Sequence, residues 1–192
     1  MIVTIHQPEH FPYMGFFQKM EQADLFVLLD DAQYTKNNFQ NRNKFINNND
    51  VEEWFTIGLE SSPNKKLIKD VLVSDHPKWK KTILTKLQNT FKVDFSEIYN
   101  HDKLVDINIA SIEYIRECLG IKVPMVLSST LNIQSQSSQR LADICKHYKA
   151  TKYISGAGGT AYLDTSVFDC DVEYFHPDVQ NYYTSLQHIH KA

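Results

Sequence analysis

The sequence predicts an α/β fold: a single domain over residues 1–192, with a mostly parallel sheet flanked by helices and a long polar loop after the second strand. Two short apolar runs, residues 2–5 and 25–29, are typical of buried strands. Phe16, Phe17 and Met20 give the segment between them one apolar side, as in an amphipathic helix. A strand, a helix and a strand in this order form a βαβ unit, whose two strands run parallel.

The segment after the second strand is polar and rich in asparagine. Residues 33–50 show no helical periodicity, so we expect a long loop or an irregular hairpin there. Loops of this length inside compact domains are uncommon and are often functional. Residues 54–59 predict a further strand, with an antiparallel orientation as one alternative, and residues 67–73 predict a weaker strand.

Helical patterns dominate the middle of the chain. Asp75 is expected to cap one helix, Gly120 to end a second, and Ser137 or Ser138 to cap a third. Their apolar positions are Trp79, Ile83, Leu87 and Phe91, then Ile112, Ile115 and Leu119, then Leu141, Ile144, Cys145 and Tyr148. Further strands are predicted at residues 123–127, 153–154 and 172–175.

The composition narrows the class of protein. The chain carries a net charge of −3 and has a pI near 6.2, which argues against a nucleic-acid-binding surface because such surfaces usually carry a basic excess. No window has the apolar length that a bilayer-spanning helix needs, and the first ten residues do not resemble a signal peptide. Cys118, Cys145 and Cys170 are widely spaced, so we expect reduced thiols in a cytoplasmic protein.

Polar residues follow the first two predicted strands. His6 and Gln7 come directly after the first strand, and Asp30 and Asp31 directly after the second. Ligands of open α/β sheets bind beyond the carboxyl ends of the strands, so His6, Asp30 and Asp31 are candidate catalytic acids or bases and Gln7 is a candidate substrate contact. The alternatives are a core histidine with one satisfied ring nitrogen, and an aspartate pair in which one carboxylate caps a turn while the other is solvated.

No pattern of metal binding or covalent catalysis stands out. His6 and His10 are four residues apart, but Pro8 disfavours a continuous helix through both, so no metal ligands are predicted. The sequence lacks GxSxG and HExxH motifs, and no cysteine lies beside a strand-end histidine. The sequence contains no motif from which we could assign a cofactor.

The polar segment combines amides with cationic side chains. Amides both donate and accept hydrogen bonds, and arginine holds phosphate or carboxylate in a bidentate manner, so this composition suits a hydroxyl-rich or phosphorylated ligand. The alternative is a solvated surface loop. The candidate substrate-binding residues of the segment are Gln33, Tyr34, Lys36, Gln40, Asn41 and Arg42.

A glycine-rich turn follows the strand at residues 153–154. Successive backbone N–H groups in such a turn can form a nest for an anion. The spacing matches neither the P-loop nor the GxGxxG fingerprint, so the alternative is a tight turn that needs positive φ. His176 follows the last predicted strand and is expected to reach the same sheet edge as His6. The candidate residues of the turn itself are Ser155, Gly156, Gly158 and Gly159.

One set of residues forms a pattern from the first strand to the last. It comprises Ile5, His6, Gln7, Pro8, Gly15, Phe16, Phe17, Lys19, Ala23, Asp24, Phe26, Val27, Leu29, Asp30, Asp31, Gln33, Tyr34, Asn41, Arg42, Tyr153, Ile154, Ser155, Gly156, Gly159, Tyr162, Leu163, His176 and Pro177. This pattern resembles the WbqC-like protein family, and the resemblance spans nearly the whole chain. Tyr162 joins the candidate substrate-binding residues through it.

The resemblance implies a role in bacterial surface-polysaccharide biosynthesis, including the O-antigen of lipopolysaccharide, because similar proteins sit in those gene clusters. It also implies transfer of glycine or a related acyl group onto an amino sugar. Members of the family continue past the equivalent of Ala192 with a further apolar segment, so we expect this chain to be truncated at its C-terminus.

The leading hypothesis is a transferase that forms an amide by moving a glycyl or other acyl group onto a nucleotide-linked amino sugar. His6 or Asp31 would deprotonate the amine, and the glycine turn would hold a phosphate or an oxyanion. The expected partners are a nucleotide sugar, an acyl donor and, from exposed aromatics, a second copy of the chain in a homodimer. One alternative is a nucleotidyl-transferring or adenylate-forming enzyme, although the second histidine of an HxGH motif is missing. Another is a non-catalytic nucleotide-sugar-binding protein.

All three hypotheses depend on one geometric expectation. The ends of the first two strands, the polar segment and the glycine turn must line a common cleft. His6, Asp31, Arg42 and Gly158 represent these four segments.

Overall fold

The computed structural model describes residues 1–190, and the chain divides into two compact units of three segments each. Unit 1 consists of Met1–Gln7, Gly15–Asp30 and Lys122–Gln180. Unit 2 consists of Pro8–Met14, Asp31–Ile121 and the described residues from Asn181 onward. The chain therefore passes between the units several times, and no single position in the sequence separates them.

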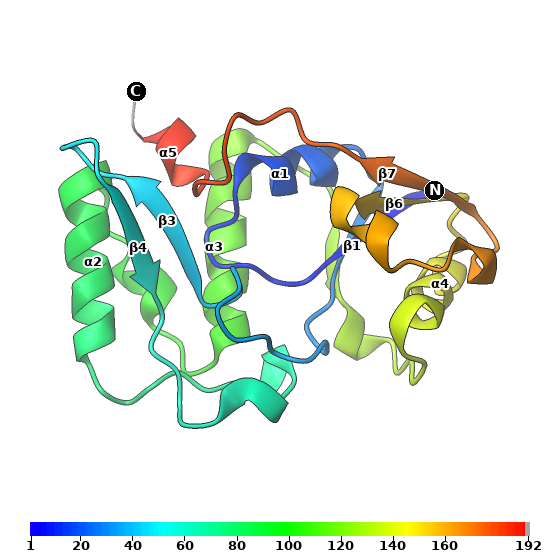
Figure 1. The fold of residues 1–192 in the computed structure, drawn as a ribbon, viewed down its shortest axis with the longest axis horizontal. Coiled ribbons are helices and arrows are strands. Elements are labelled where there is room, and N and C mark those ends of the chain that lie inside the picture. The colour runs from blue at the N-terminus through cyan, green and yellow to red at the C-terminus, as the bar shows by residue number, and fades with distance from the viewer. Residues whose placement is uncertain (191–192) are drawn as a thin grey trace. The chain divides into compact units, whose positions relative to one another are not determined.

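Unit 1 is built on a five-stranded sheet in which every pair of neighbouring strands is parallel. The strand order is β5-β2-β1-β6-β7 (Figure 1). The α/β class, the mostly parallel sheet and the βαβ start predicted from the sequence are confirmed. The strands are β1 Ile2–His6, β2 Leu25–Leu28, β5 Met125–Leu127, β6 Lys152–Gly156 and β7 Asp171–Phe175.

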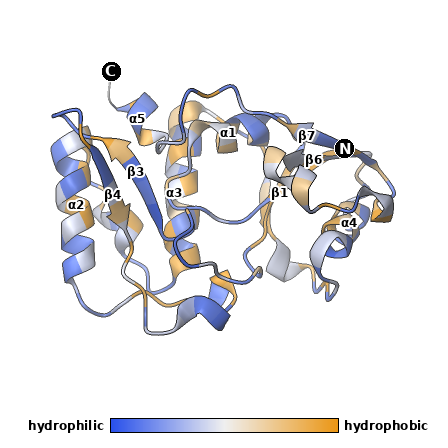
Figure 2. Ribbon diagram, viewed as in Figure 1, coloured by the Kyte–Doolittle hydropathy of each residue, from blue (hydrophilic) through white to orange (hydrophobic). Residues whose placement is uncertain are grey.

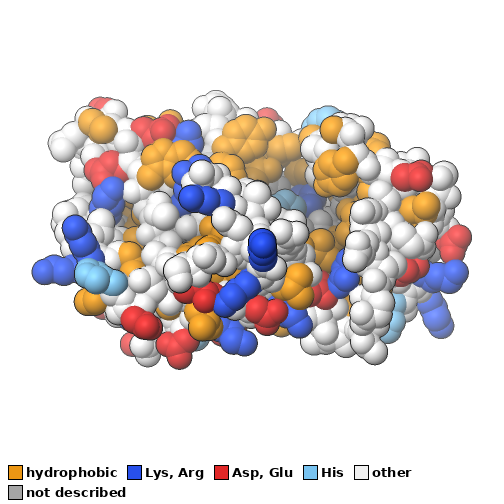
Figure 3. All heavy atoms as spheres, turned by 60° about the horizontal axis from the view of Figure 1, so that its bottom comes forward, with side chains coloured by type: hydrophobic (Ala, Val, Ile, Leu, Met, Phe, Trp, Pro, Cys, Tyr) orange, Lys and Arg blue, Asp and Glu red, His pale blue; other side chains and the backbone are white. Residues whose placement is uncertain are grey.

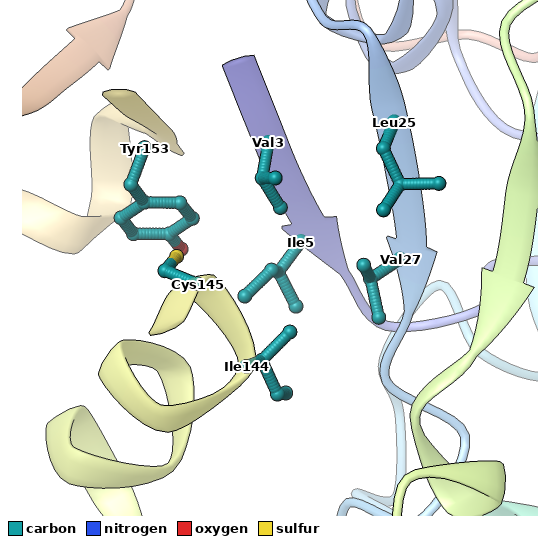
Figure 4. Close-up of a cluster of buried hydrophobic side chains, with 7 residues drawn as sticks. All are labelled: Val3, Ile5, Leu25, Val27, Ile144, Cys145 and Tyr153. Atoms are coloured by element: carbon teal, nitrogen blue, oxygen red, sulfur yellow. The ribbon is translucent and has the colours of Figure 1, made fainter. Parts of the chain in front are cut away.

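Helices pack on both faces of this sheet, and its central strands β1 and β2 are buried on both sides. Ile5, Val27 and Ile144 belong to one buried cluster, and Figure 4 shows Ile144 pointing from its helix toward the side chains of β1. Successive residues of a strand point to opposite faces, so Phe26 lies on the other face, where its ring centroid is 5.0 Å from that of Phe16. The two helices are α1 Met14–Glu21 and α4 Ser137–His147.

Unit 2 packs an antiparallel hairpin with helices around an aromatic core. The rings of Phe11 and Phe95 lie 5.3 Å apart, and those of His10 and Phe55 lie 5.2 Å apart, both edge-on. In Figure 2, helix α3 is mostly coloured as hydrophobic, in line with its many buried positions, and it ends as predicted at Gly120 with φ 71°. The elements are β3 Arg42–Ile46, β4 Glu52–Thr56, α2 Lys78–Phe91, α3 Leu104–Leu119 and α5 Leu186–Ile189.

Two predictions for the segments after β2 are refined. A polar loop does follow β2, up to Asn41, and of the two alternatives for residues 33–50 the hairpin applies to their second half, where β3 pairs with β4 in regular rather than irregular antiparallel register. Residues 67–73 are not a strand: they contain the 3₁₀ turn Ile68–Asp70, and Leu67, Leu72 and Val73 make only isolated bridges. Other short 3₁₀ segments are Pro63–Lys65, Ser96–Tyr99, Ser128–Thr130, Ala157–Ala161 and Thr165–Val167.

Two predicted helix caps are also wrong. Asp75 does not cap α2, because Pro77 occupies the N-cap position and the helix begins at Lys78. Proline suits a helix start because it has no backbone N–H to satisfy there. Neither serine caps α4: its N-cap residue is Gln136, and no side chain caps that end of the helix.

The surface carries charges of both signs. Lys and Arg side chains are interspersed with Asp and Glu side chains on the face drawn in Figure 3. Among residues 1–190, no helix is long and apolar enough to cross a membrane. Over the same residues, no three His, Cys, Asp or Glu side chains are grouped so that they could hold a metal ion.

Candidate functional site

The strand order of unit 1 reverses between β1 and β6. In doubly wound sheets, ligands bind outside the carboxyl ends of the strands at this reversal. Thr4 of β1 pairs with Ile154 of β6, so His6 and Gly156, each two residues further on, lie at the carboxyl ends of these neighbouring strands. The expectation that the first strand end and the glycine turn share a sheet edge therefore holds within unit 1.

His6 at this edge is a neutral imidazole. Its Nδ1 lies 3.0 Å from the Gln7 carbonyl oxygen, and its ring packs edge-on against Phe16 with centroids 4.9 Å apart. A carbonyl only accepts, so Nδ1 carries the proton and Nε2 the lone pair. Burial of the ring lowers the pKa of His6 to about 3, the charge of Lys19 adds to this effect, and the Gln7 contact opposes it. Such an imidazole accepts a proton poorly at neutral pH.

Lys19 is a charged residue at this edge that sequence reasoning did not select. Its side chain is buried because it lies on the side of α1 that faces the sheet. Its Nζ donates to the Ile5 carbonyl oxygen at 3.2 Å. The Nζ also lies 6.0 Å from the centroid of the Phe26 ring. A lysine next to the apolar Met20 on an otherwise apolar helix face was the available signal, because buried lysines are rare.

Asp30 links the ends of β2 and β5. Its Oδ1 accepts hydrogen bonds from the Ser129 backbone N–H at 2.9 Å and from the Ser128 hydroxyl at 3.2 Å. Its Oδ2 accepts from the Ser129 hydroxyl at 2.6 Å. Both oxygens of this buried carboxylate are thus engaged in holding the loop after β5. Asp31 belongs to unit 2 and is half-buried.

The glycine turn continues β6 into the 3₁₀ segment Ala157–Ala161. The alternative that it needs positive φ is wrong: among the described glycines only Gly120 has positive φ. Gly159 is required for space instead, because a Cβ there would lie 2.2 Å from the Ser155 hydroxyl oxygen. The remaining candidates of unit 1, Tyr162 and His176, are exposed, and His176 follows β7, two strands away from β1.

Unit 2 contains a cavity of about 480 Å³ that gathers several predicted residues. We call it the polar pocket. One part of its lining comes from the segment before β3 and from the start of that strand, and the other from the last residue of β4 and the residues after it. Its lining residues are Tyr34, Lys36, Asn37, Asn41, Arg42, Thr56, Leu59, Glu60, Ser62, Pro63 and Asn64.

Buried amides fix the segment that forms this pocket. Asn108 donates through Nδ2 to the carbonyl oxygens of Pro8 and Gln40 at 3.1 and 2.8 Å. The Gln40 side chain accepts from the Thr35 N–H at 2.9 Å and is itself buried. Gln40 therefore does not line the pocket but holds the backbone of the segment that does.

Two further hydrogen bonds hold the wall residues. The Tyr34 hydroxyl donates to Asn41 Oδ1 at 3.0 Å, and Asn41 Nδ2 donates to the Ile57 carbonyl oxygen at 3.2 Å. Gln33 Nε2 donates to the Asn64 carbonyl oxygen at 2.9 Å, which ties the two parts of the lining together. Burial raises the pKa of Tyr34, and the nearby Arg42 opposes the shift, so the hydroxyl stays protonated at neutral pH.

Arg42 is the central cation of the polar pocket. Its Nη2 donates to the Asn37 carbonyl oxygen at 2.7 Å, and its guanidinium lies 4.5 Å from the centre of the Trp54 ring. Its Nε is buried and has no hydrogen-bond partner within the described part of the chain. Lys36 adds a second, exposed cation to the lining.

Glu60 is a pocket residue that the sequence analysis missed. Its carboxylate accepts from the Leu72 N–H at 2.8 Å and pairs with Lys66 at 2.6 Å. These two contacts, the backbone N–H first, lower the pKa of Glu60, so it is ionised at neutral pH. Nothing in the local sequence marks it, because it reaches the pocket only through the fold of the residues after β4.

Two residues of the lining have a left-handed backbone. Asn37 has φ 62° and Ser62 has φ 67°. Asparagine tolerates this region, but for serine it is uncommon and costs roughly 1–2 kcal/mol. Backbone strain of this kind clusters at functional sites.

The comparisons with known proteins agree with the pattern read from the sequence. The WbqC-like protein family matches residues 7–190. The chain belongs to this family. The match includes every candidate site residue except His6, which lies one position before it.

This WbqC-like chain is similar to an uncharacterized protein, Rv1507c, of Mycobacterium tuberculosis (strain ATCC 25618 / H37Rv). The two are 28% identical over 180 residues, which cover 87% of this chain and 77% of that protein. No solved structure matches the WbqC-like chain.

The predicted site residues thus fall into two groups in this WbqC-like protein. Tyr34, Lys36, Asn41 and Arg42 line one pocket of unit 2, with Gln33 and Gln40 supporting it. His6, Gln7, Asp30, Ser155, Gly156, Gly158, Gly159, Tyr162 and His176 belong to unit 1. That all four segments line one cleft stays a prediction.

Proposed function

We propose that the polar pocket binds a nucleotide-linked amino sugar and that the chain transfers a glycyl or other acyl group onto the sugar amine, in the biosynthesis of a surface polysaccharide. The observation that supports this proposal is the pair of cationic side chains in the pocket lining, Arg42 and Lys36. Arg42 donates from Nη2 to the Asn37 carbonyl oxygen, and a guanidinium carries further donors that an anionic ligand group can accept from.

The charges of the pocket suit both ends of such a ligand. Arg42 and Lys36 would hold the phosphates, since a guanidinium can contact two phosphate oxygens at once. Glu60 is the acidic side chain of the lining, and the ammonium of the amino sugar would lie beside its carboxylate, which the Leu72 N–H and Lys66 already contact. Asn64 offers an amide for the hydroxyl groups.

Amide formation joins the sugar nitrogen to the acyl carbon of a thioester while the carbon–sulfur bond breaks and the sulfur leaves as a thiol. It needs a group that takes a proton from the attacking amine and passes it to the departing sulfur. His6 is a weak base at its depressed pKa of about 3, and Asp30 is engaged by Ser128 and Ser129. Asp31, which precedes the polar pocket segment in unit 2, stays the proposed base. Ser155 to Gly159, in unit 1, remain by themselves a proposed backbone nest for an anion.

The test is product formation from a uridine-diphosphate-linked amino sugar and an acyl or aminoacyl thioester. Mass spectrometry should detect the sugar with the added acyl mass, and Arg42→Ala should lower its yield by at least tenfold. Lys44→Ala is the matched control: Lys44 also stacks near Trp54, at 5.5 Å, but does not line the pocket, so its yield should stay within twofold. Equal yields from Arg42→Ala and wild type would remove the polar pocket from the reaction.

A second candidate is binding without turnover, as in a nucleotide-sugar-binding protein of an assembly complex. The low pKa of His6 and the full engagement of Asp30 favour it, because both leave fewer groups for proton transfer. Calorimetry would then show binding that depends on Arg42, with no acylated product for any donor. Acylated product in the wild-type reaction excludes this candidate.

A further inference from the structure

A second cavity of unit 2 adjoins the polar pocket. It has a volume of about 430 Å³, which is within the range of small-molecule sites. It is lined by the residues that leave β4 and by the first turns of α2, and we call it the aromatic pocket after Trp54 and Trp79. Thr56 and Leu59 line both cavities, so the two cavities are immediate neighbours.

The aromatic surfaces of this pocket are held in place. Trp79 Nε1 donates to the Ser74 carbonyl oxygen at 2.9 Å, which fixes the indole. The same indole packs against Gly58, where an added Cβ would lie 2.6 Å from its Cδ1 atom. Trp54 is 37% exposed as a residue, and its ring is positioned by the Arg42 guanidinium at 4.5 Å and by the stacked ring of Phe39 at 6.4 Å between centroids. The two are the only tryptophans of the sequence.

Arg42 connects the two cavities. Its guanidinium lines the polar pocket, while the Trp54 ring against which it stacks at 4.5 Å lines the aromatic pocket. A phosphate bound to Arg42 would therefore lie close to an aromatic stacking surface. An anion site beside an aromatic stacking surface matches the two recognisable parts of a nucleotide, its phosphates and its flat base.

We infer that the aromatic pocket binds the base of a nucleoside diphosphate whose phosphates are held by Arg42 and Lys36. The inference rests on the proposed function and deepens it, since it assigns the nucleoside part of the substrate its own subsite. A base stacks on tryptophan whatever its identity, and Ser74, His76 and Lys78 supply polar groups for its edge or for the ribose.

Tryptophan fluorescence tests the inference directly, because both tryptophans line this cavity. Uridine diphosphate and adenosine diphosphate are titrated beside inorganic pyrophosphate, which lacks a base, and calorimetry measures each affinity. At least one nucleoside diphosphate should quench the emission and bind tenfold or more tightly than pyrophosphate. Arg42→Ala should weaken all three ligands.

A matched pair of variants separates the pocket from the rest of helix α2. Thr82 is exposed and lines the aromatic pocket, whereas Thr85 is exposed on the same helix and does not line it. Thr82→Phe should fill the cavity and weaken the nucleoside diphosphate at least fivefold, with pyrophosphate unchanged. Thr85→Phe should change neither affinity, and both variants should keep the thermal midpoint of the wild type.

The outcomes distinguish this inference from the proposed function. Pyrophosphate binding that depends on Arg42, with no tighter binding of either nucleoside diphosphate and no effect of Thr82→Phe, would overturn the base subsite alone. No binding of any of the three ligands would overturn both. Nucleoside diphosphate binding that Arg42→Ala leaves unchanged would also overturn the inference, because the phosphates would then bind elsewhere.

Discussion

The carboxyl edge of the unit 1 sheet and the polar pocket of unit 2 both gather polar side chains, but they engage them differently. At the sheet edge, Asp30 accepts three hydrogen bonds and Lys19 donates to the backbone of β1. In the pocket, Lys36 is exposed, and Arg42 lines the cavity while it donates from Nη2 to the Asn37 carbonyl oxygen. Polar groups that satisfy one another stabilise the fold, whereas groups that face a cavity can bind a ligand. A position at a strand end is therefore weaker evidence for a binding role than a cationic side chain in the lining of a cavity.

The largest expected effect concerns the buried support of the polar pocket. Asn108→Ala removes two donors from the carbonyl oxygens of Pro8 and Gln40, and each buried acceptor left without a partner costs about 1–3 kcal/mol. The free energy of unfolding should fall by about 2–4 kcal/mol in urea denaturation. Asn89→Ala, at an exposed position of α2, should change it by less than about 0.5 kcal/mol. Equal stabilities of the two variants would contradict the role of Asn108.

The next effect tests whether Asp30 holds structure. Asp30→Asn replaces a carboxylate that accepts three hydrogen bonds with an amide that has one acceptor oxygen. The free energy of unfolding should fall by about 1–2 kcal/mol. Asp50→Asn is the control, because Asp50 is exposed with φ 59°, a conformation that asparagine adopts readily. Unchanged stability of Asp30→Asn, combined with loss of product, would move Asp30 from the scaffold to the reaction.

A third effect appears only in acid. Burial lowers the pKa of His10 to about 3, below the value near 6.5 of an unfolded histidine. The unfolded chain therefore binds this proton first, so stability is fully present above about pH 6.5 and is lost as the pH falls toward 3. Unfolding should be measured between pH 7 and pH 4 for the wild type and for His10→Gln. The variant should show the weaker pH dependence, and parallel curves would refute the assignment to His10.

The smallest effect is expected at an exposed ion pair of unit 1. Lys152 of β6 and Glu173 of β7 lie 2.8 Å apart, and both side chains are well exposed to solvent. Exposed pairs contribute little because water screens the charges, so Lys152→Ala should leave the urea midpoint of unfolding close to that of the wild type. A clear fall of the midpoint would show that the sheet edge depends on its surface charges.

The sequence predicted unit 1 better than unit 2. Residues 2–5 and 25–29 are continuous apolar runs, and such runs form buried parallel strands with little ambiguity. Strand β3 escaped prediction because its inward positions are Asn43 and Phe45. A buried asparagine breaks the apolar alternation, yet it is satisfied here, since it donates to the carbonyl oxygens of His10 and Phe11 at 3.2 and 2.8 Å.

The candidate site was predictable only in part. Tyr34, Lys36, Asn41 and Arg42 could be selected because they are close together in the sequence. Glu60 reaches the same pocket from a separate segment, and no local pattern reports that approach. The tertiary fold decides such long-range placements, as it does for the aromatic pocket.

The alternation of segments between the units has a consequence for synthesis on the ribosome. Thr184 and Ser185 are buried in unit 2 and donate their N–H groups to the carbonyl oxygens of Lys44 and Pro12. The nascent chain must therefore emerge at least as far as Ser185 before unit 2 can close, although the segment with Pro12 leaves the tunnel much earlier. β7 likewise comes late for unit 1. Neither unit can be obtained by cutting the gene at one point. To express one unit alone, its separate segments must be fused into a new chain.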